Sequence, residues 1–312
     1  MESRLAAAVA GPRRPFPRGV GGPPAPGYSQ TRDEMRLFRR RRARAVAFVL
    51  SGGGNYGALQ VGALQVLLEA GIRPDMLVGT SAGALNAAFL ATDPTPAAAQ
   101  RLGEIWCSVC PQDVGAHGNL VMLRRLLTNK ISIYDSQRLA HFLEAHIPAG
   151  VVTFGDLEVR AYAVAVRLPE GALRVFGDVS TDRLLDGMMA SSAIAPFYPP
   201  WPCDGALYVD GGVLSKLPLM VAVERGATEI YALDVQDALG SLGESPGMIE
   251  VTGQTISLML AQQVEAEEAL VRRRRIPLHT ISLDHGGLPF WDFDHAADLI
   301  VRGRAAAEAA LE

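Results

Sequence analysis

Three glycine-rich turns hold the residues of this chain that could do chemistry. They occur in the order Gly52–Gly57, Gly79–Gly83 and Asp210–Gly212. The first turn offers backbone N–H donors without side chains, the second carries Ser81 and the third carries a carboxylate. A nucleophile, a base and donors for a developing oxyanion are the parts of an acyl-transfer site. The ordered trio therefore predicts an acyl hydrolase.

Ser81 has a glycine two residues away on each side, at Gly79 and Gly83. An apolar run that predicts a strand precedes it, and a run of small residues that predicts a helix follows. A sharp strand-to-helix turn exposes a serine hydroxyl, and glycines are needed where a β-carbon would collide with the neighbouring chain. The N-terminus of the following helix favours negative charge at the same point. We interpret Ser81 as the nucleophile on the strength of this context, because the five-residue string alone is weak.

The first glycine run also fits the spacing of a dinucleotide-binding loop. No acidic residue ends a second strand about 20 residues later, and the Gly-Lys-Ser/Thr ending of a nucleotide-binding P-loop is absent. A glycine run beside a nucleophile can instead present two backbone N–H groups to an oxyanion. A non-catalytic nucleotide-binding or scaffold protein stays open as an alternative. We interpret the run as an oxyanion loop made by Gly52, Gly53 and Gly54.

Asp210 follows an apolar run and precedes two glycines, so it could simply cap its own turn. A solvated carboxylate with a pKa near 4 is a weak base for a serine. As the base for Ser81 it would have to be buried and within hydrogen-bond reach of the hydroxyl. The alternative base is His285, which stands late in the chain, where an α/β-hydrolase-like esterase carries its triad histidine. That Ser-His-Asp triad stays open.

Apolar runs alternate with helical periods along the chain and predict an α/β sandwich around a largely parallel sheet. The predicted strands are Ala45–Leu50, Met76–Val78, Val159–Val166, Ala172–Phe176, Ala206–Val209, Ala227–Leu233 and Leu278–Leu283. The predicted helices are Gly57–Ala70, Ala82–Ala91, Pro96–Val109, Ser136–His146, Thr181–Met189, Gly247–Arg275 and Ala296–Ala310. Residues 191–202 are predicted to be a loop rich in proline and aromatic residues.

Composition narrows the classes of partner. Residues 1–44 carry 11 arginines and 3 acids and predict a disordered or non-native tail, whereas residues 45–312 carry 18 basic and 30 acidic side chains and predict one catalytic domain. The acidic charge of this domain argues against nucleic acid as a binding partner.

The sequence contains no apolar run of about 18 residues, so no membrane span is predicted. The pair Cys107 and Cys110 has no second pair, so we expect no metal. We expect a cytoplasmic protein that contacts a membrane at most at its surface, through tail arginines or through aromatic clusters near residues 197–201 and 288–293.

With these motifs the sequence resembles the patatin-like phospholipase family. The family pattern combines a glycine-rich oxyanion loop, a Gly-x-Ser-x-Gly turn and a late Asp-Gly or Asp-Ala pair, matched here by the three turns described above. A further family block, Ala-Ser-x-Ala followed by prolines and aromatic residues, matches Ala190–Ala193. The resemblance extends from Ala45 to Ala310.

The resemblance implies a three-layer α/β/α fold and hydrolysis of fatty acyl esters in lipids, of the phospholipase A or lipid esterase type, with no cofactor. It implies that Ser81 and Asp210 form a dyad without histidine, with the N–H groups of Gly53 and Gly54 as oxyanion donors. Supporting motif positions are Gly57, Gly79, Gly83 and Gly211. One position departs from the pattern: Tyr56 stands where the family usually has Arg or Lys. The missing positive charge bears on substrate preference more than on catalysis, because the donors are backbone groups.

Overall fold

The computed structural model describes residues 44–115, 132–236, 247–288 and 292–312, and from residue 44 on the chain forms one compact unit. The predicted tail over residues 1–44 lies outside the described residues except for Arg44. The guanidinium of Arg44 donates a hydrogen bond of 2.7 Å to the carboxylate of Glu229. The boundary of the predicted tail thus stays a prediction.

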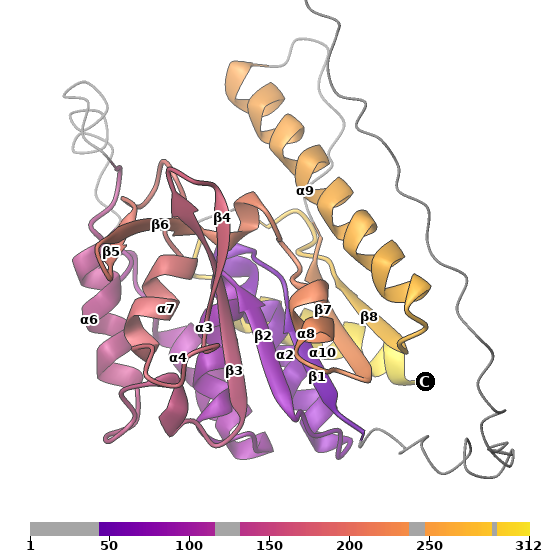
Figure 1. Ribbon diagram of the computed structural model, residues 1–312. Coiled ribbons are helices and arrows are strands. Elements are labelled where there is room, and N and C mark those ends of the chain that lie inside the picture. Colours follow the sequence, from indigo (N-terminus) through magenta and orange to yellow (C-terminus); the bar gives the residue numbers. More distant parts are fainter. Residues whose placement is uncertain (1–43, 116–131, 237–246, 289–291) are drawn as a thin grey trace, which may run out of the picture. The chain divides into compact units, whose positions relative to one another are not determined.

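Among the described residues, eight strands form one mixed sheet (Figure 1). Its parallel part has the order β3-β2-β1-β7-β8. These strands span Val46–Leu50 (β1), Met76–Thr80 (β2), Arg160–Leu168 (β3), Glu229–Val235 (β7) and Leu278–Leu283 (β8). Both β4 (Ala172–Phe176) and β6 (Ala206–Asp210) pair antiparallel with β3, and the short β5 (Trp201–Cys203) pairs antiparallel with β6.

Helices cover both faces of the sheet. Alternate residues of β1 show this, because Phe48 and Leu50 join one buried cluster while Ala47 and Val49 join another. The first cluster packs under α2 (Gly57–Glu69), α3 (Ala82–Ala91), α4 (Pro96–Ser108), α6 (Ser136–His146), α7 (Leu184–Ser191) and α10 (Ala296–Leu311). The second packs under α8 (Leu219–Glu224) and α9 (Met248–Arg273). Strands buried on both faces explain the continuous apolar runs of the sequence. The predicted three-layer α/β/α architecture with a largely parallel sheet is confirmed.

Helix α2, which follows the glycine loop, lies backbone to backbone against α10. A β-carbon at Gly62 would lie 2.0 Å from the carbonyl oxygen of Ile300, and one at Gly303 would lie 1.9 Å from that of Leu59. No side chain fits at either position, so the two glycines allow the helices to touch. This contact fixes the helix on which the glycine loop is mounted.

Most helices and strands lie within a few residues of the bounds predicted from the sequence. The differences arise from contacts between distant segments. The helix predicted from Thr181 begins only at Leu184, because Arg183 forms a β-bridge with Thr153. The carboxylate of Asp182 meanwhile accepts a hydrogen bond of 2.9 Å from the N–H of Gly177. Strand β5 lies in the segment predicted as a loop, and the short α8 was not predicted. Three short 3₁₀ turns complete the chain at Gly54–Tyr56 (η1), Phe154–Asp156 (η2) and Gly211–Val213 (η3).

Candidate active site

The sheet register brings Ser81 and Asp210 together. Thr80, the last residue of β2, pairs with Val164 of β3, and Asp210, the last residue of β6, pairs with the next residue, Ala165. Because β2 runs parallel to β3 and β6 runs antiparallel to it, the two strands advance toward the same point from opposite directions. Ser81 follows Thr80 directly. The nucleophile and base predicted from sequence therefore meet at one position of the sheet.

Ser81 stands in strained backbone geometry at the start of α3. Its φ of 54° and ψ of −126° lie in a region that side chains rarely adopt. The flanking glycines permit this turn, because a β-carbon at Gly79 would lie 2.2 Å from the carbonyl oxygen of Gly83, and one at Gly83 would lie 2.5 Å from that of Leu50. The serine thus points out of a sharp strand-to-helix turn with the N-terminus of α3 behind it.

Asp210 is a buried carboxylate, with 4% of its surface exposed. Its Oδ1 accepts a hydrogen bond of 2.7 Å from the N–H of Gly212. Burial raises the pKa of the Asp210 carboxyl from 3.8 to about 6, against the opposing effect of hydrogen bonds from the Ser81 hydroxyl and from Gly212. Its Oδ2 has no partner at full hydrogen-bond geometry among the described residues, so the contact with Ser81 is a loose one. A loose contact that tightens when substrate binds is common in unliganded active sites.

The C-terminal end of α7 holds both residues in place. The Oγ of Ser191 accepts a hydrogen bond of 2.9 Å from the backbone N–H of Ser81 and donates one of 2.6 Å to the carbonyl of Val164. Two residues later, the carbonyl of Ala193 accepts a hydrogen bond of 3.1 Å from the backbone N–H of Asp210. This Ala-Ser-x-Ala block matches the family pattern, but no role for it was predicted from the sequence. In the structure, its hydrogen bonds hold the backbones of Ser81 and Asp210, the predicted nucleophile and base.

The glycine loop lies against Ser81, since a β-carbon at Gly52 would lie 3.4 Å from that of the serine. The N–H of Gly52 donates a hydrogen bond of 3.0 Å to the carbonyl of Lys216, so it is occupied within the fold. No hydrogen bond joins the N–H groups of Gly53 and Gly54 to other residues of the described part of the chain. Of the three predicted oxyanion residues, only Gly53 and Gly54 therefore have available donors.

Two further glycines allow close packing around the site. A β-carbon at Gly57 would lie 2.7 Å from the ring of Trp106 and 2.9 Å from the β-carbon of Ala82. At Gly211, the residue after the aspartate, a β-carbon would lie 2.3 Å from the carbonyl oxygen of Val164. Gly57 thus allows the glycine loop to approach α3 and α4, and Gly211 allows the segment after Asp210 to approach β3.

Lys216 is a buried cation that sequence analysis missed. Besides accepting the N–H of Gly52, it donates a hydrogen bond of 2.6 Å from Nζ to the carbonyl of Val235, and Nζ lies 3.8 Å from the carboxylate of Asp234. The side chain of Val235 in turn packs against Gly53, where a β-carbon would approach it to 3.1 Å. The lysine thus ties the glycine loop to the end of β7. A single lysine within the run Leu-Ser-Lys-Leu-Pro was the only signal available in the sequence.

His285, the alternative base, is buried and engaged elsewhere. Its ring stacks on Tyr56, with ring centroids 4.4 Å apart and planes 11° apart, and its Nδ1 accepts a hydrogen bond of 3.2 Å from the N–H of Gly287. The hydroxyl of Tyr56 donates a hydrogen bond of 2.7 Å to the carbonyl of Leu288. These contacts fasten the turn after the glycine loop to the segment before α10. They do not support a triad through His285.

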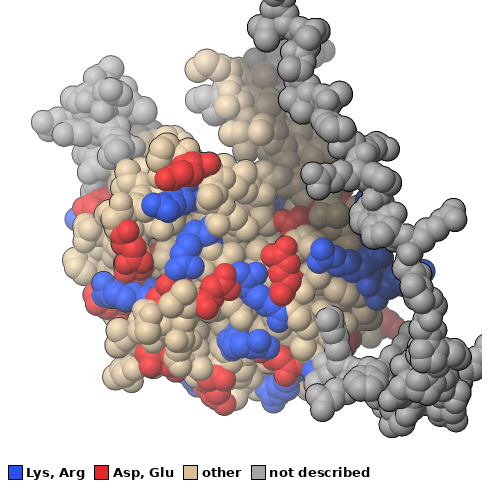
Figure 2. All heavy atoms as spheres, in the orientation of Figure 1, with Lys and Arg blue, Asp and Glu red and all other residues tan. Residues whose placement is uncertain are grey.

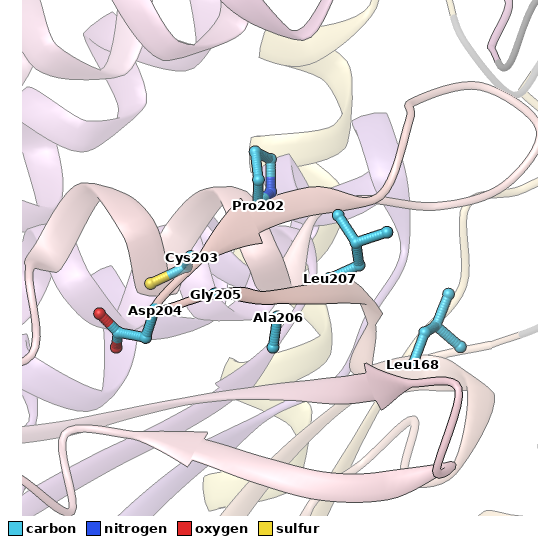
Figure 3. A pocket seen from close by; sticks show the side chains of 7 residues that line it. All are labelled: Leu168, Pro202, Cys203, Asp204, Gly205, Ala206 and Leu207. Carbon is cyan, nitrogen blue, oxygen red and sulfur yellow. The ribbon is translucent and has the colours of Figure 1, made fainter.

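A surface pocket that is lined by neither Ser81 nor Asp210 lies at the β5–β6 hairpin (Figure 3). It is lined by Leu168, Pro202, Cys203, Asp204, Gly205, Ala206 and Leu207. Within the described ranges no group of three metal-ligating side chains gathers, and Cys107 and Cys110 are both exposed.

No helix in those ranges has the length and hydropathy to cross a membrane. Of the predicted aromatic contacts, Tyr198 is buried and donates to the carbonyl of Val114, while residues 290 and 291 lie outside the described residues.

Comparisons with known proteins identify a family and several relatives that this chain resembles. The model of the family described as patatin-like phospholipase matches residues 48–223, more than half of the chain. Mouse patatin-like phospholipase domain-containing protein 7 is 30% identical over 213 residues, and human patatin-like phospholipase domain-containing protein 6 is 28% identical over 207 residues. Lysophospholipase NTE1 of Eremothecium gossypii is 28% identical over 213 residues. Each alignment covers 65% of this chain but only 13–14% of the relative, so the chain spans a small part of their length. Among solved structures, VipD from Legionella pneumophila is similar with a TM-score of 0.46 at 13% identity, over 86% of this chain and 66% of that one.

Proposed function

The chain belongs to the patatin-like phospholipase family, and we propose that it hydrolyses fatty acyl esters of lipids through a dyad of Ser81 and Asp210. The observation that carries the proposal is the meeting of a strained serine and a buried carboxylate at consecutive register positions of β3. No hydrogen bond joins an imidazole to either residue in the described part of the chain, so the carboxylate is the candidate base.

In the acylation step, the Oγ of Ser81 attacks the ester carbonyl carbon while its proton passes to Asp210. The carbonyl oxygen becomes an oxyanion and accepts hydrogen bonds from the N–H groups of Gly53 and Gly54, which are free to donate. The bond to the leaving oxygen then breaks, and Asp210 returns the proton to the leaving alcohol. An acyl ester on Ser81 remains.

In the deacylation step, water gives a proton to Asp210 and attacks the acyl carbon. The oxyanion that forms in this step accepts hydrogen bonds from the same N–H groups of Gly53 and Gly54. When the bond to Ser81 breaks, the serine recovers a proton from Asp210 and the fatty acid leaves. No cofactor takes part in either step.

The electrostatic setting suits a carboxylate to this work. A pKa of about 6 makes Asp210 a stronger base than a solvated aspartate while leaving it mostly ionised at neutral pH. Its burial also keeps the serine–carboxylate contact away from competing water. The N-terminus of α3 adds a positive potential where the oxyanion develops.

The decisive test compares the wild type with Ser81→Ala and Asp210→Asn on a p-nitrophenyl acyl ester. We expect each substitution to lower kcat by at least about 10³-fold in a folded protein. A fluorophosphonate should label the wild type but not Ser81→Ala, and it should still label Ser192→Ala, a neighbouring buried serine outside the dyad. Full activity in either dyad variant, or an unreactive folded wild type, would overturn the proposal. The second result would favour a binding protein.

A further inference from the structure

The N-terminal half of α9 carries apolar side chains that nothing covers in the described structure. Among the described side chains of the helix, Val264 is the first that is buried, and those before it are exposed or half-exposed. Ile256 is 52% exposed and Met259 62% exposed. At 1.5 Å per residue, the stretch from 248 to 263 is about 24 Å long. In Figure 1 this half of the helix stands clear of the other labelled elements.

Apart from Glu250 in its first turn, this half of the helix is also uncharged. Between Glu250 and Glu265 the sequence holds no Asp, Glu, Lys or Arg. Figure 2 shows the same contrast, because red and blue side chains are spread over the body of the protein while the projecting helix end is tan. A solvent-facing helix normally carries charges on its outer face, and a contiguous exposed apolar surface marks an interaction site.

The apolar surface continues onto the catalytic loop. Val213 is 58% exposed and Leu214 is 45% exposed, and they follow Asp210 by three and four residues. The side-chain amide of Gln263 donates a hydrogen bond of 3.1 Å to the carbonyl of Val213, which ties α9 to this loop. Ile256 lies seven residues before Gln263.

Helical geometry places Ile256, Met259 and Gln263 on one face, because they are spaced at i, i+3 and i+7. Because Gln263 is bound to Val213, the face that carries Ile256 and Met259 extends away from the loop that follows Asp210. We name the set Val213, Leu214, Ile256 and Met259 the α9 rim.

We propose that the α9 rim docks on the surface of a lipid bilayer whose headgroups carry no net charge. This inference rests on the proposed lipid hydrolase function. Whatever covers the rim also lies beside the loop that carries Asp210. A protein partner there would obstruct the approach to the dyad, whereas a lipid surface delivers the substrate itself.

The absence of charge selects the kind of bilayer. The rim contains no Lys or Arg that would draw it to anionic lipid, so attachment depends on buried apolar area. The exposed glutamates that border the uncharged stretch, Glu250 and Glu265, would be repelled by an anionic surface. Zwitterionic lipid fits both observations.

The test measures co-sedimentation of the full chain with phosphatidylcholine vesicles, in a Ser81→Ala background that removes hydrolysis. The test variant is the double substitution Ile256→Asp and Met259→Asp. Val301→Asp is the matched control, since Val301 is an equally exposed apolar residue on α10, on the other face of the sheet. We expect the double variant to lose at least tenfold in vesicle partitioning and the control to bind like its parent. Circular dichroism checks that each variant is folded.

Several results would overturn the docking proposal. Equal binding of the double variant and the control would do so, as would a failure of the parent to bind phosphatidylcholine. Binding only to anionic vesicles, abolished by salt, would assign attachment to the arginines of residues 1–44. Loss of self-association in the double variant, without vesicle binding by the parent, would assign the rim to a second copy of the chain. Binding is measured in the Ser81→Ala background, so its outcome does not depend on whether the wild type hydrolyses lipid. The docking proposal and the hydrolase proposal can therefore fail independently of each other.

Discussion

The side chain of Ser191 accepts the backbone N–H of Ser81 at 2.9 Å while its own hydroxyl donates to the carbonyl of Val164 at 2.6 Å. Ser81 has a backbone conformation that a side chain adopts only under constraint. One buried hydroxyl thus links the end of α7, the strained turn and the central strand β3. The backbone position of Ser81, the proposed nucleophile, therefore depends on Ser191.

Ser191→Ala should therefore lower kcat of ester hydrolysis by roughly tenfold or more, with KM changed little. The substitution leaves the N–H of Ser81 and the carbonyl of Val164 buried without partners, which costs about 1–3 kcal/mol each at most. Steady-state kinetics on a soluble ester and urea unfolding measure the two effects. Ser192→Ala is the matched control, because the buried hydroxyl of Ser192 has no hydrogen-bond partner among the described residues. An equal effect of both substitutions would contradict a specific role for Ser191.

The activity should fall at acid pH with an apparent pKa of about 6. The base must be ionised, and burial raises the pKa of Asp210 to about 6. Below that value kcat/KM should drop about tenfold for each pH unit, and above it the profile should flatten. The measurement uses a soluble ester between pH 4.5 and 8, with circular dichroism at each pH to show that the protein stays folded. A flat profile down to pH 5 would exclude Asp210 as the titrating base.

Asp210→Asn should stabilise the fold at neutral pH while it abolishes turnover. The carboxyl has a higher pKa folded than unfolded, so its ionisation opposes folding. The wild-type protein should lose stability as pH rises from about 4 through about 6, and the loss is on the order of 3 kcal/mol for a rise from 3.8 to about 6. Asparagine can still accept the N–H of Gly212 and carries no charge. Urea denaturation at pH 4 and pH 8 should show a gap between the two proteins only at the higher pH. A variant that is less stable at pH 8 would contradict this account.

His285→Phe should retain most ester hydrolysis. Phenylalanine keeps an aromatic ring against Tyr56 but removes any imidazole base, so a dyad enzyme should tolerate it within a few-fold in kcat. Some stability should be lost with the hydrogen bond from Gly287 to Nδ1. Kinetics and thermal unfolding separate the two effects. A loss of more than about 10³-fold in a folded variant would restore the triad alternative.

Much of the turn that carries Ser81 was predictable from sequence because its parts are neighbours along the chain. The strand before Ser81, the helix after it and the two glycines interact within a few residues, and steric rules for such turns are local. The alternation of apolar runs and helical periods likewise predicted the layered sheet, since burial on both faces leaves a direct mark on composition. Tyr56 was visible as a departure from the family pattern, but its stacking on His285 was not.

The sequence by itself determined which residue types are available for catalysis, and in what order. Only the tertiary structure decided that Asp210 lies beside Ser81, that the N–H of Gly52 donates to the carbonyl of Lys216, and that His285 stacks on Tyr56. These outcomes follow from strand register and from the burial of polar groups. Both depend on contacts between segments far apart in the chain. The burial that raises the pKa of Asp210 likewise cannot be predicted from the residues next to it.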